Sequence, residues 1–315
     1  MAREFSYTFR LLGPATSSRL KQKSIQLGVA DYLVKPIPLP VLRNALTAAS
    51  RPQRERMTRK QGKLVLFAGA RGGVGTSTLA ANVSWILANR ANRRVALLDL
   101  DLYSGDCALL LGTEPTTGLR DALETPDRVD ALFVERTMTK CSDGLFVMNS
   151  ETRLDMALDF GREAIDPLLN ILLTQFHYVI VDLPRTLQRI HQRVLETANV
   201  RVIVADLTLR SLRDTVRLLS HFGADSETAR TMLVVNRRGE HAGAEIPLDE
   251  FSKAARQTLR HVIPFDPKAG IVAANLGKPV AAGRGRVPEA IAAIAADIGG
   301  SKAPERSRWP LRYFK

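Results

Sequence analysis

Residues 63–78, KLVLFAGARGGVGTST, join an apolar strand to a glycine-rich turn and to the start of a helix. Gly72, Gly73 and Gly75 allow a tight turn with positive φ angles, and they let the backbone approach a ligand closely. The helix predicted over 77–90 points its free N–H groups and the positive end of its dipole at the same place. This stretch therefore predicts a loop that binds a polyphosphate.

Four side chains of this loop bear on its chemistry. Ser77 is placed to offer its hydroxyl to Mg²⁺, and Thr78 is placed to bond an α-phosphate. Thr76 stands where such a loop normally carries lysine, and Arg71 lies five residues earlier. The loop thus predicts nucleotide binding, while the missing lysine leaves hydrolysis an open question.

The chain after Lys63 alternates short apolar runs with amphipathic segments, which is typical of an α/β fold with a parallel sheet. Several of the runs are continuous Val, Ile and Leu, as expected for strands that helices cover on both faces. The predicted strands are 63–69, 94–101, 144–150, 178–184, 200–207, 231–237 and 261–265. The predicted helices are 77–90, 154–175, 187–198, 210–222, 249–260 and 288–298. We expect a P-loop NTPase fold with a mostly parallel central sheet flanked by helices.

Three carboxylates follow the predicted strands. Asp99 and Asp101 close the second strand, and Asp182 ends the run YVIVD. The carboxyl ends of parallel strands meet at one edge of the sheet, where a nucleotide and its metal bind. The pattern predicts that Asp182 holds Mg²⁺ through water and that Asp101 orients an attacking water.

Five motifs, in this order, resemble the MinD/ParA superfamily of deviant Walker ATPases. They are ARGGVGTST, LLDLDL, YVIVDLP, VVNRR and IPFDPKAGIVAANLGKPV. The resemblance runs from about Lys63 to Ile298. Within the superfamily, the sequence is most similar to the CpaE/TadZ branch, which consists of localisation factors for Flp-type (tad) pilus assembly. The features that indicate this branch are the absent loop lysine and the stretches DLDLYSGD and DLPR.

The resemblance implies a role for each matching position around the phosphates. Arg71 falls on the signature lysine that reaches across a dimer, and Thr76 falls on the loop lysine. Ser77 matches the metal ligand, Asp101 the water-orienting carboxylate and Asp182 the Walker B carboxylate. The implied cofactors are ATP and Mg²⁺, bound in a homodimer.

Two further positions match the part of the family site that binds the base. Asn236 matches an asparagine that reads adenine, and Pro264 matches the segment that packs against it. The family pattern is broken at Ala70, where a glycine is expected, and at Thr76. Losing the lysine removes a fixed charge from the β- and γ-phosphates, so we expect ATP binding with weak or absent hydrolysis.

The sequence predicts four segments. They are a degenerate receiver-like segment (1–49), a basic linker (50–62), the ATPase domain (63–298) and a basic tail (299–315). Residues 27–49 resemble the last strand and helix of a two-component receiver, with Lys35-Pro36 after the strand. Only Glu4 and Asp31 are acidic before that pair, so a complete phosphorylation site is excluded.

The net charge of +13 is carried by the two ends of the chain. Residues 1–60 hold twelve Lys or Arg against three Asp or Glu, whereas 61–300 is neutral. A neutral body argues against a nucleic-acid-binding domain. The tail RSRWPLRYFK (306–315) leaves two alternatives, a disordered or partner-binding tail and an anchor at the inner face of the membrane.

Cys107 and Cys141 show neither metal-binding spacing nor a disulfide framework, and no apolar run is long enough to span a bilayer. We therefore expect a cytoplasmic protein, with recruitment to the membrane or a cell pole as a further option. Its favoured role is a nucleotide-dependent assembly factor for a Flp-type pilus, working with pilus and secretion proteins. The alternatives are an active ATPase that positions a division site, flagella or DNA, and a signalling output protein acting through the receiver-like segment.

Overall fold

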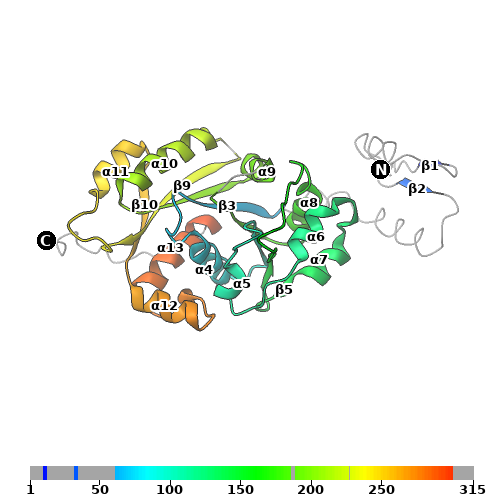
Figure 1. Cartoon of the computed structure of the whole chain (residues 1–315), viewed down its shortest axis with the longest axis horizontal. Helices are drawn as coiled ribbons and strands as arrows, with labels where there is room; N and C mark the ends of the chain where they lie inside the picture. The colour runs from blue at the N-terminus through cyan, green and yellow to red at the C-terminus, as the bar shows by residue number, and fades with distance from the viewer. Residues whose placement is uncertain (1–9, 13–31, 35–60, 186–188, 227, 301–315) are drawn as a thin grey trace, which may run out of the picture. The chain divides into compact units, whose positions relative to one another are not determined.

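The computed structural model describes residues 10–12, 32–34, 61–185, 189–226 and 228–300 (Figure 1). It divides the chain into two compact units, 1–60 and 61–315. In the first unit, β1 (Arg10–Leu12) pairs in parallel with β2 (Tyr32–Val34). The remainder of the receiver-like segment, most of the linker and the tail 301–315 lie outside the described residues.

The second unit is built on an eight-stranded sheet with the strand order β10-β9-β8-β3-β7-β4-β6-β5. Only the β5–β6 pair is antiparallel within it. The strands are β3 (Lys63–Gly69), β4 (Val95–Asp99), β5 (Thr139–Lys140), β6 (Leu145–Met148), β7 (Tyr178–Asp182), β8 (Val200–Ala205), β9 (Arg230–Arg238) and β10 (Leu259–Pro264). The predicted α/β fold with a mostly parallel sheet is confirmed.

Helices cover both faces of this sheet (Figure 1). One face carries α4 (Thr76–Asn89), α5 (Cys107–Leu110), α12 (Pro267–Asn275) and α13 (Arg286–Gly299), with the short 3₁₀ helix η2 (Val280–Ala282). The other carries α6 (Gly118–Glu124), η1 (Pro126–Arg128), α7 (Ala131–Thr137), α8 (Asp166–Gln175), α9 (Arg189–Thr197), α10 (Leu209–Phe222) and α11 (Leu248–Ala255). Alternate residues of each strand therefore enter two separate hydrophobic cores, as the pleat of a strand requires.

Strand β3 shows this division most clearly. Leu64 and Leu66 are buried in the core under α6–α11, whereas Val65 and Phe67 are buried in the core under α4 and α13. A strand that is buried on both faces has no polar side to alternate with. That is why the sequence of β3 reads as one continuous apolar run.

Two predicted helices are shorter in the structure than the pattern indicated. The helix predicted over 154–175 begins only at Asp166, because Pro167 fits in the first turn of a helix and not in its interior. The helix predicted over 249–260 ends at Ala255. Arg256 then adopts φ +51°, and β10 begins at Leu259.

The order of the strands creates a crevice at the end of β3. From β3 the chain moves to β4 and β6 on one side, and later to β8, β9 and β10 on the other. Ligands of open α/β sheets bind at such a switch point, beyond the carboxyl ends of the strands. The glycine-rich turn 69–75 leaves β3 at that place.

Candidate nucleotide and metal site

The glycine-rich turn forms the floor of the crevice. Gly73 has φ +78° and Gly75 has φ +89°, a region that glycine enters without strain. The turn is tied to β8 by a hydrogen bond from the Ala70 N–H to the Val204 carbonyl, at 2.8 Å. Helix α4 begins at Thr76 with no acidic residue in its first turn, so its positive end is free for an anion.

Two adjoining cavities lie over this turn. The first, of about 560 Å³, is lined by Arg71, Gly72, Gly73, Gly75, Thr76, Ser77, Thr78, Asp101 and Asp182 among others. The second, of about 410 Å³, is lined by Gly75, Thr78, Asn236 and Pro264 among others. The polar cavity thus gathers the residues predicted to hold phosphate and metal, and the more apolar one gathers those predicted to hold the base. Gly75 and Thr78 line both, so one elongated ligand can occupy the two together.

Asn236 connects the strand end to the loop. Its side-chain amide donates a hydrogen bond of 2.7 Å to the Val74 carbonyl, and its Oδ1 accepts one of 2.9 Å from the Arg237 N–H. A Cβ placed on Gly75 would lie 2.6 Å from the Asn236 amide nitrogen. Asn236 therefore stabilises the loop through its hydrogen bond to Val74, in addition to lining the second cavity.

Gly75→Ala should lower the free energy of unfolding by about 2 kcal/mol, because alanine is strained at positive φ and its methyl group would displace Asn236. Gly72→Ala is the matched control, since a Cβ there meets no atom within 4 Å. Urea unfolding of the nucleotide-free protein measures both changes. Equal effects of the two substitutions would contradict this account of the loop.

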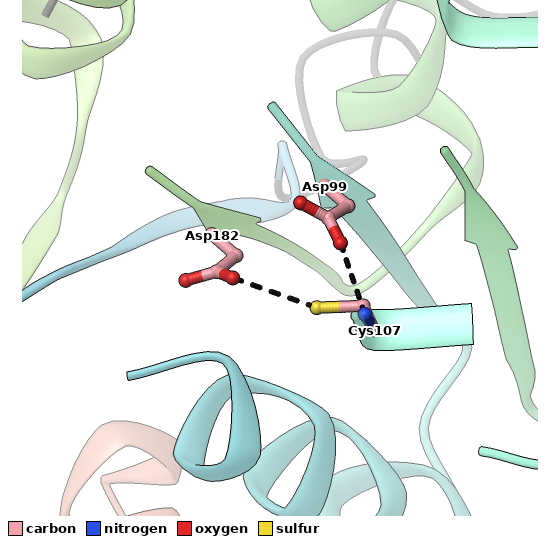
Figure 2. A group of neighbouring side chains, drawn as sticks. All are labelled: Asp99, Cys107 and Asp182. Atoms are coloured by element: carbon pink, nitrogen blue, oxygen red, sulfur yellow. Dashed lines mark hydrogen bonds between the residues drawn. The ribbon is translucent and has the colours of Figure 1, made fainter. Parts of the chain in front are cut away.

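The acidic part of the site lies between β4 and β7. Asp99 and Asp182 are paired directly across these neighbouring strands, and both side chains are buried (Figure 2). Asp99 accepts hydrogen bonds from the Cys107 N–H at 3.0 Å and from the Asp101 N–H at 3.2 Å. Asp101 itself accepts from the Ser104 N–H at 3.0 Å, in the turn that borders the first cavity.

Burial raises the pKa of Asp99 to about 6. Burial also raises the pKa of Asp182 well above its ordinary value, and the facing Asp99 carboxylate adds to the rise, while the Ser77 hydroxyl acts in the opposite direction. Oδ1 of Asp182 is buried and accepts no hydrogen bond from the described residues. Two buried carboxylates with an unused oxygen fit a divalent cation, which would supply the missing positive charge.

Arg71 does not extend into the first cavity as a free cation. Its guanidinium forms an ion pair with Asp206, which follows β8, and donates a hydrogen bond of 2.9 Å to the Gly72 carbonyl. Thr208 donates a second bond to Asp206, at 2.8 Å. Burial raises the pKa of Asp206, but these bonds, led by that from Arg71, outweigh it and lower the pKa below the usual value.

Asp206→Asn should lower the free energy of unfolding by about 1–2 kcal/mol at neutral pH, because the ion pair with Arg71 is lost. The loss stays this small because Arg71 is partly exposed and its guanidinium can be hydrated instead. A folded-state pKa below the unfolded one stabilises the protein above the unfolded pKa, which is about 3.9. The difference between wild type and variant should therefore be constant above about pH 5 and shrink as the pH falls further. Urea unfolding at several pH values measures it.

The exposed pair Arg153–Asp155 supplies the control for that experiment. Asp155→Asn removes an ion pair of similar type that lies wholly in solvent, so the unfolding midpoint should stay where it is. If the loss of unfolding free energy in Asp206→Asn stayed the same below pH 5, the ion pair would not be its cause.

Sequence reasoning missed two residues of the site. Cys107 lies between Asp99 and Asp182, although its spacing from either aspartate along the chain matches no metal motif. Asp206 follows the apolar run of β8 and so had the same signal as Asp182, an acid at the end of a strand. Both cysteines are free thiols.

The crevice, the glycine-rich loop and the strand-end carboxylates together define a P-loop nucleotide-binding protein. The family model of the ParA proteins, described as NUBPL iron-transfer P-loop NTPase, matches residues 60–224. The septum site-determining protein MinD of Bacillus subtilis is 25% identical over 249 residues, 77% of this chain and 91% of that protein. The chain belongs to the MinD/ParA family of P-loop NTPases.

Solved structures agree with this fold. A ParA family ATPase from Chlorobium tepidum superimposes with a TM-score of 0.67 at 24% identity, over 75% of this chain and 98% of that one. The MinD of Pyrococcus horikoshii in complex with Mg-ADP gives a TM-score of 0.64 at 19% identity, over 75% and 95% of the two chains. Among the described residues, no helix has the length and apolar character that crossing a membrane requires.

Proposed function

We propose that this protein binds ATP·Mg²⁺ and hydrolyses it weakly or not at all. The observation that carries the proposal is Thr76, a neutral residue that lines the phosphate cavity at the position where such a loop normally carries lysine. Ser77 and Asp182 would hold the Mg²⁺, and Asn236 and Pro264 would border the base. The MinD of Pyrococcus horikoshii, which was solved with Mg-ADP, supports the choice of cofactor.

The positions of the arginines around the first cavity support the proposal that ATP hydrolysis is slow. Arg71 is held by Asp206, and the other two arginines that line this cavity are Arg185 and Arg237. None of the three follows Gly75, where the lysine of such a loop stands. Phosphoryl transfer needs charge fixed at the β- and γ-phosphates, whereas binding draws also on backbone N–H groups, the metal and the base cavity. Binding therefore survives a change that slows the chemistry.

In this proposal the nucleotide acts as a switch. ATP would favour a homodimer that encloses the nucleotide, and the dimer would expose a surface for partners. The resemblance to the CpaE/TadZ branch supports a role in placing or assembling a Flp-type pilus, in the cytoplasm and at the membrane or a pole. The receiver-like segment and the basic tail would then serve as contacts with pilus and secretion proteins.

Measuring Mg·ATP affinity and hydrolysis on one sample tests the proposal. Calorimetry should show ATP binding that weakens when EDTA removes Mg²⁺, and steady-state release of phosphate should stay near background. Size exclusion with and without ATP should show a shift from monomer to dimer. Hydrolysis as fast as in ordinary P-loop ATPases would refute the proposal that the nucleotide acts as a switch without turnover. If ATP does not bind, the protein is a scaffold that has lost its nucleotide.

An active ATPase that positions a cell structure is the second candidate, and similarity to septum site-determining MinD proteins favours it. This candidate requires steady ATP turnover that rises when lipid vesicles or DNA are added. The favoured proposal expects no such rise. The same hydrolysis assay, repeated with vesicles and with plasmid DNA, separates the two.

A further inference from the structure

Cys107 occupies an unusual place for a thiol. Its side chain is fully buried at the start of α5, and Sγ lies 3.6 Å from Oδ2 of Asp182 (Figure 2). Its own N–H donates to Oδ2 of Asp99 at 3.0 Å, so the thiol and both carboxylates face one small space. One ligand atom from each of the three residues lies within 4.8 Å of the other two.

The spacing of these atoms suits a tetrahedral metal. With metal–sulfur and metal–oxygen bonds of about 2.3 Å and 2.1 Å, a sulfur and an oxygen ligand lie about 3.6 Å apart. The observed distance from Sγ to Oδ2 of Asp182 has the same value, 3.6 Å. A thiol hydrogen bond also has this length, so distance alone does not decide between the two.

The state of Asp182 supplies the independent observation. Only 3% of this residue is exposed, and its Oδ2 is turned toward the Cys107 thiol, whereas Oδ1, which accepts no hydrogen bond from the described residues, points to the opposite side (Figure 2). Asp99, which is 0% exposed, faces it from the neighbouring strand. Two buried carboxylates that face each other are costly unless a cation lies between them, and the thiol completes a set of three ligands.

We infer that Asp99, Cys107 and Asp182 form a binding site for a thiophilic divalent metal ion of the Zn²⁺ class. Mg²⁺ prefers oxygen ligands, whereas Zn²⁺ and Co²⁺ accept a mixed set of thiolate and carboxylate. On binding, the metal replaces the thiol proton, which passes to the solvent buffer. The site shares Asp182 with the proposed Mg·ATP site, so the two ligands should compete, but it does not require that ATP binds.

Co²⁺ serves as the probe, because a cobalt–thiolate bond gives an intense charge-transfer band in the near ultraviolet and carboxylate ligands give none. The full chain contains only two cysteines, Cys107 and Cys141, so the source of a band can be assigned. Adding one equivalent of Co²⁺ to the nucleotide-free wild type should produce the band. Zn²⁺ should then abolish it by displacing the cobalt.

Three variants complete the test. Cys107→Ser, which keeps the size of the side chain, should lose the band completely, and Asp182→Asn should weaken Co²⁺ binding by at least about tenfold. Cys141→Ser, at the half-buried second cysteine, is the matched control and should keep the band. Far-ultraviolet circular dichroism checks that each variant is folded.

The inference is overturned if the wild type gives no band, if Co²⁺ binds without one, or if the band survives in Cys107→Ser. Loss of the band in Cys141→Ser alone would equally overturn it. These measurements contain no nucleotide, so they stand apart from the test of ATP binding. Competition is then read by adding Mg·ATP to the cobalt-loaded protein, where the band should diminish.

Discussion

Thr76→Lys should raise the rate of ATP hydrolysis about 100-fold or more over the wild type. Thr76 is the first residue of α4 and lines the phosphate cavity, so a lysine there can reach the β- and γ-phosphates from the floor of the loop. The new charge would stabilise the negative charge that is spread over the transferring group. Steady-state phosphate release under saturating Mg·ATP measures the change.

Thr76→Met is the matched control, because methionine has nearly the length of lysine and no charge. It should leave turnover at the wild-type level. The lysine variant should also be slightly less stable without nucleotide, by about 0.3–1 kcal/mol, because a cation at the positive end of α4 is unfavourable. Mg·ATP should more than restore that loss. If the wild type already turns over as fast as Thr76→Lys, another group supplies the charge, and Arg71 is the first to examine.

The sequence predicted the sheet well because its strands are buried on both faces. Runs such as YVIVD and VRVIVA have no polar alternation to confuse with a helix, and each stands between segments of helical period. The short elements α5, α6 and α7 were missed because four to seven residues carry too little period to detect. The two 3₁₀ helices, η1 and η2, and the two-residue strand β5 showed no recognisable pattern.

The candidate site divides in the same way. The loop 69–78 could be predicted, because a glycine-rich turn between a strand and a helix is a local feature of the sequence. The group formed by Asp99, Cys107 and Asp182 could not, because it depends on the register of β4 against β7 and on the turn that leads into α5. The pairing of Arg71 with Asp206 likewise joins residues 135 positions apart. Non-local contacts of this kind follow from strand order, which the sequence pattern leaves open.

Asp182→Asn should have two effects of opposite sign. Without ligands the variant should be more stable than the wild type by about 1–3 kcal/mol, because a buried carboxylate with an unpaired oxygen and a facing carboxylate is replaced by a neutral amide. In the presence of Mg²⁺ the variant should bind ATP about 100-fold more weakly, since the carboxylate that holds the metal through water is lost. Urea unfolding and calorimetry measure the two effects.

Asp106→Asn is the control for both, because Asp106 is exposed, lines the same cavity and caps α5 without a side-chain hydrogen bond. It should change neither stability nor the dependence of ATP binding on Mg²⁺ by a comparable amount. A loss of stability in Asp182→Asn would mean that the carboxylate is well paired in the unliganded protein, which contradicts the buried, unused oxygen. Unchanged Mg²⁺ dependence would place the metal elsewhere. A gain in stability together with a loss of Mg²⁺ dependence would show that the facing carboxylates lower the stability of the unliganded protein and that the same carboxylates bind the cation.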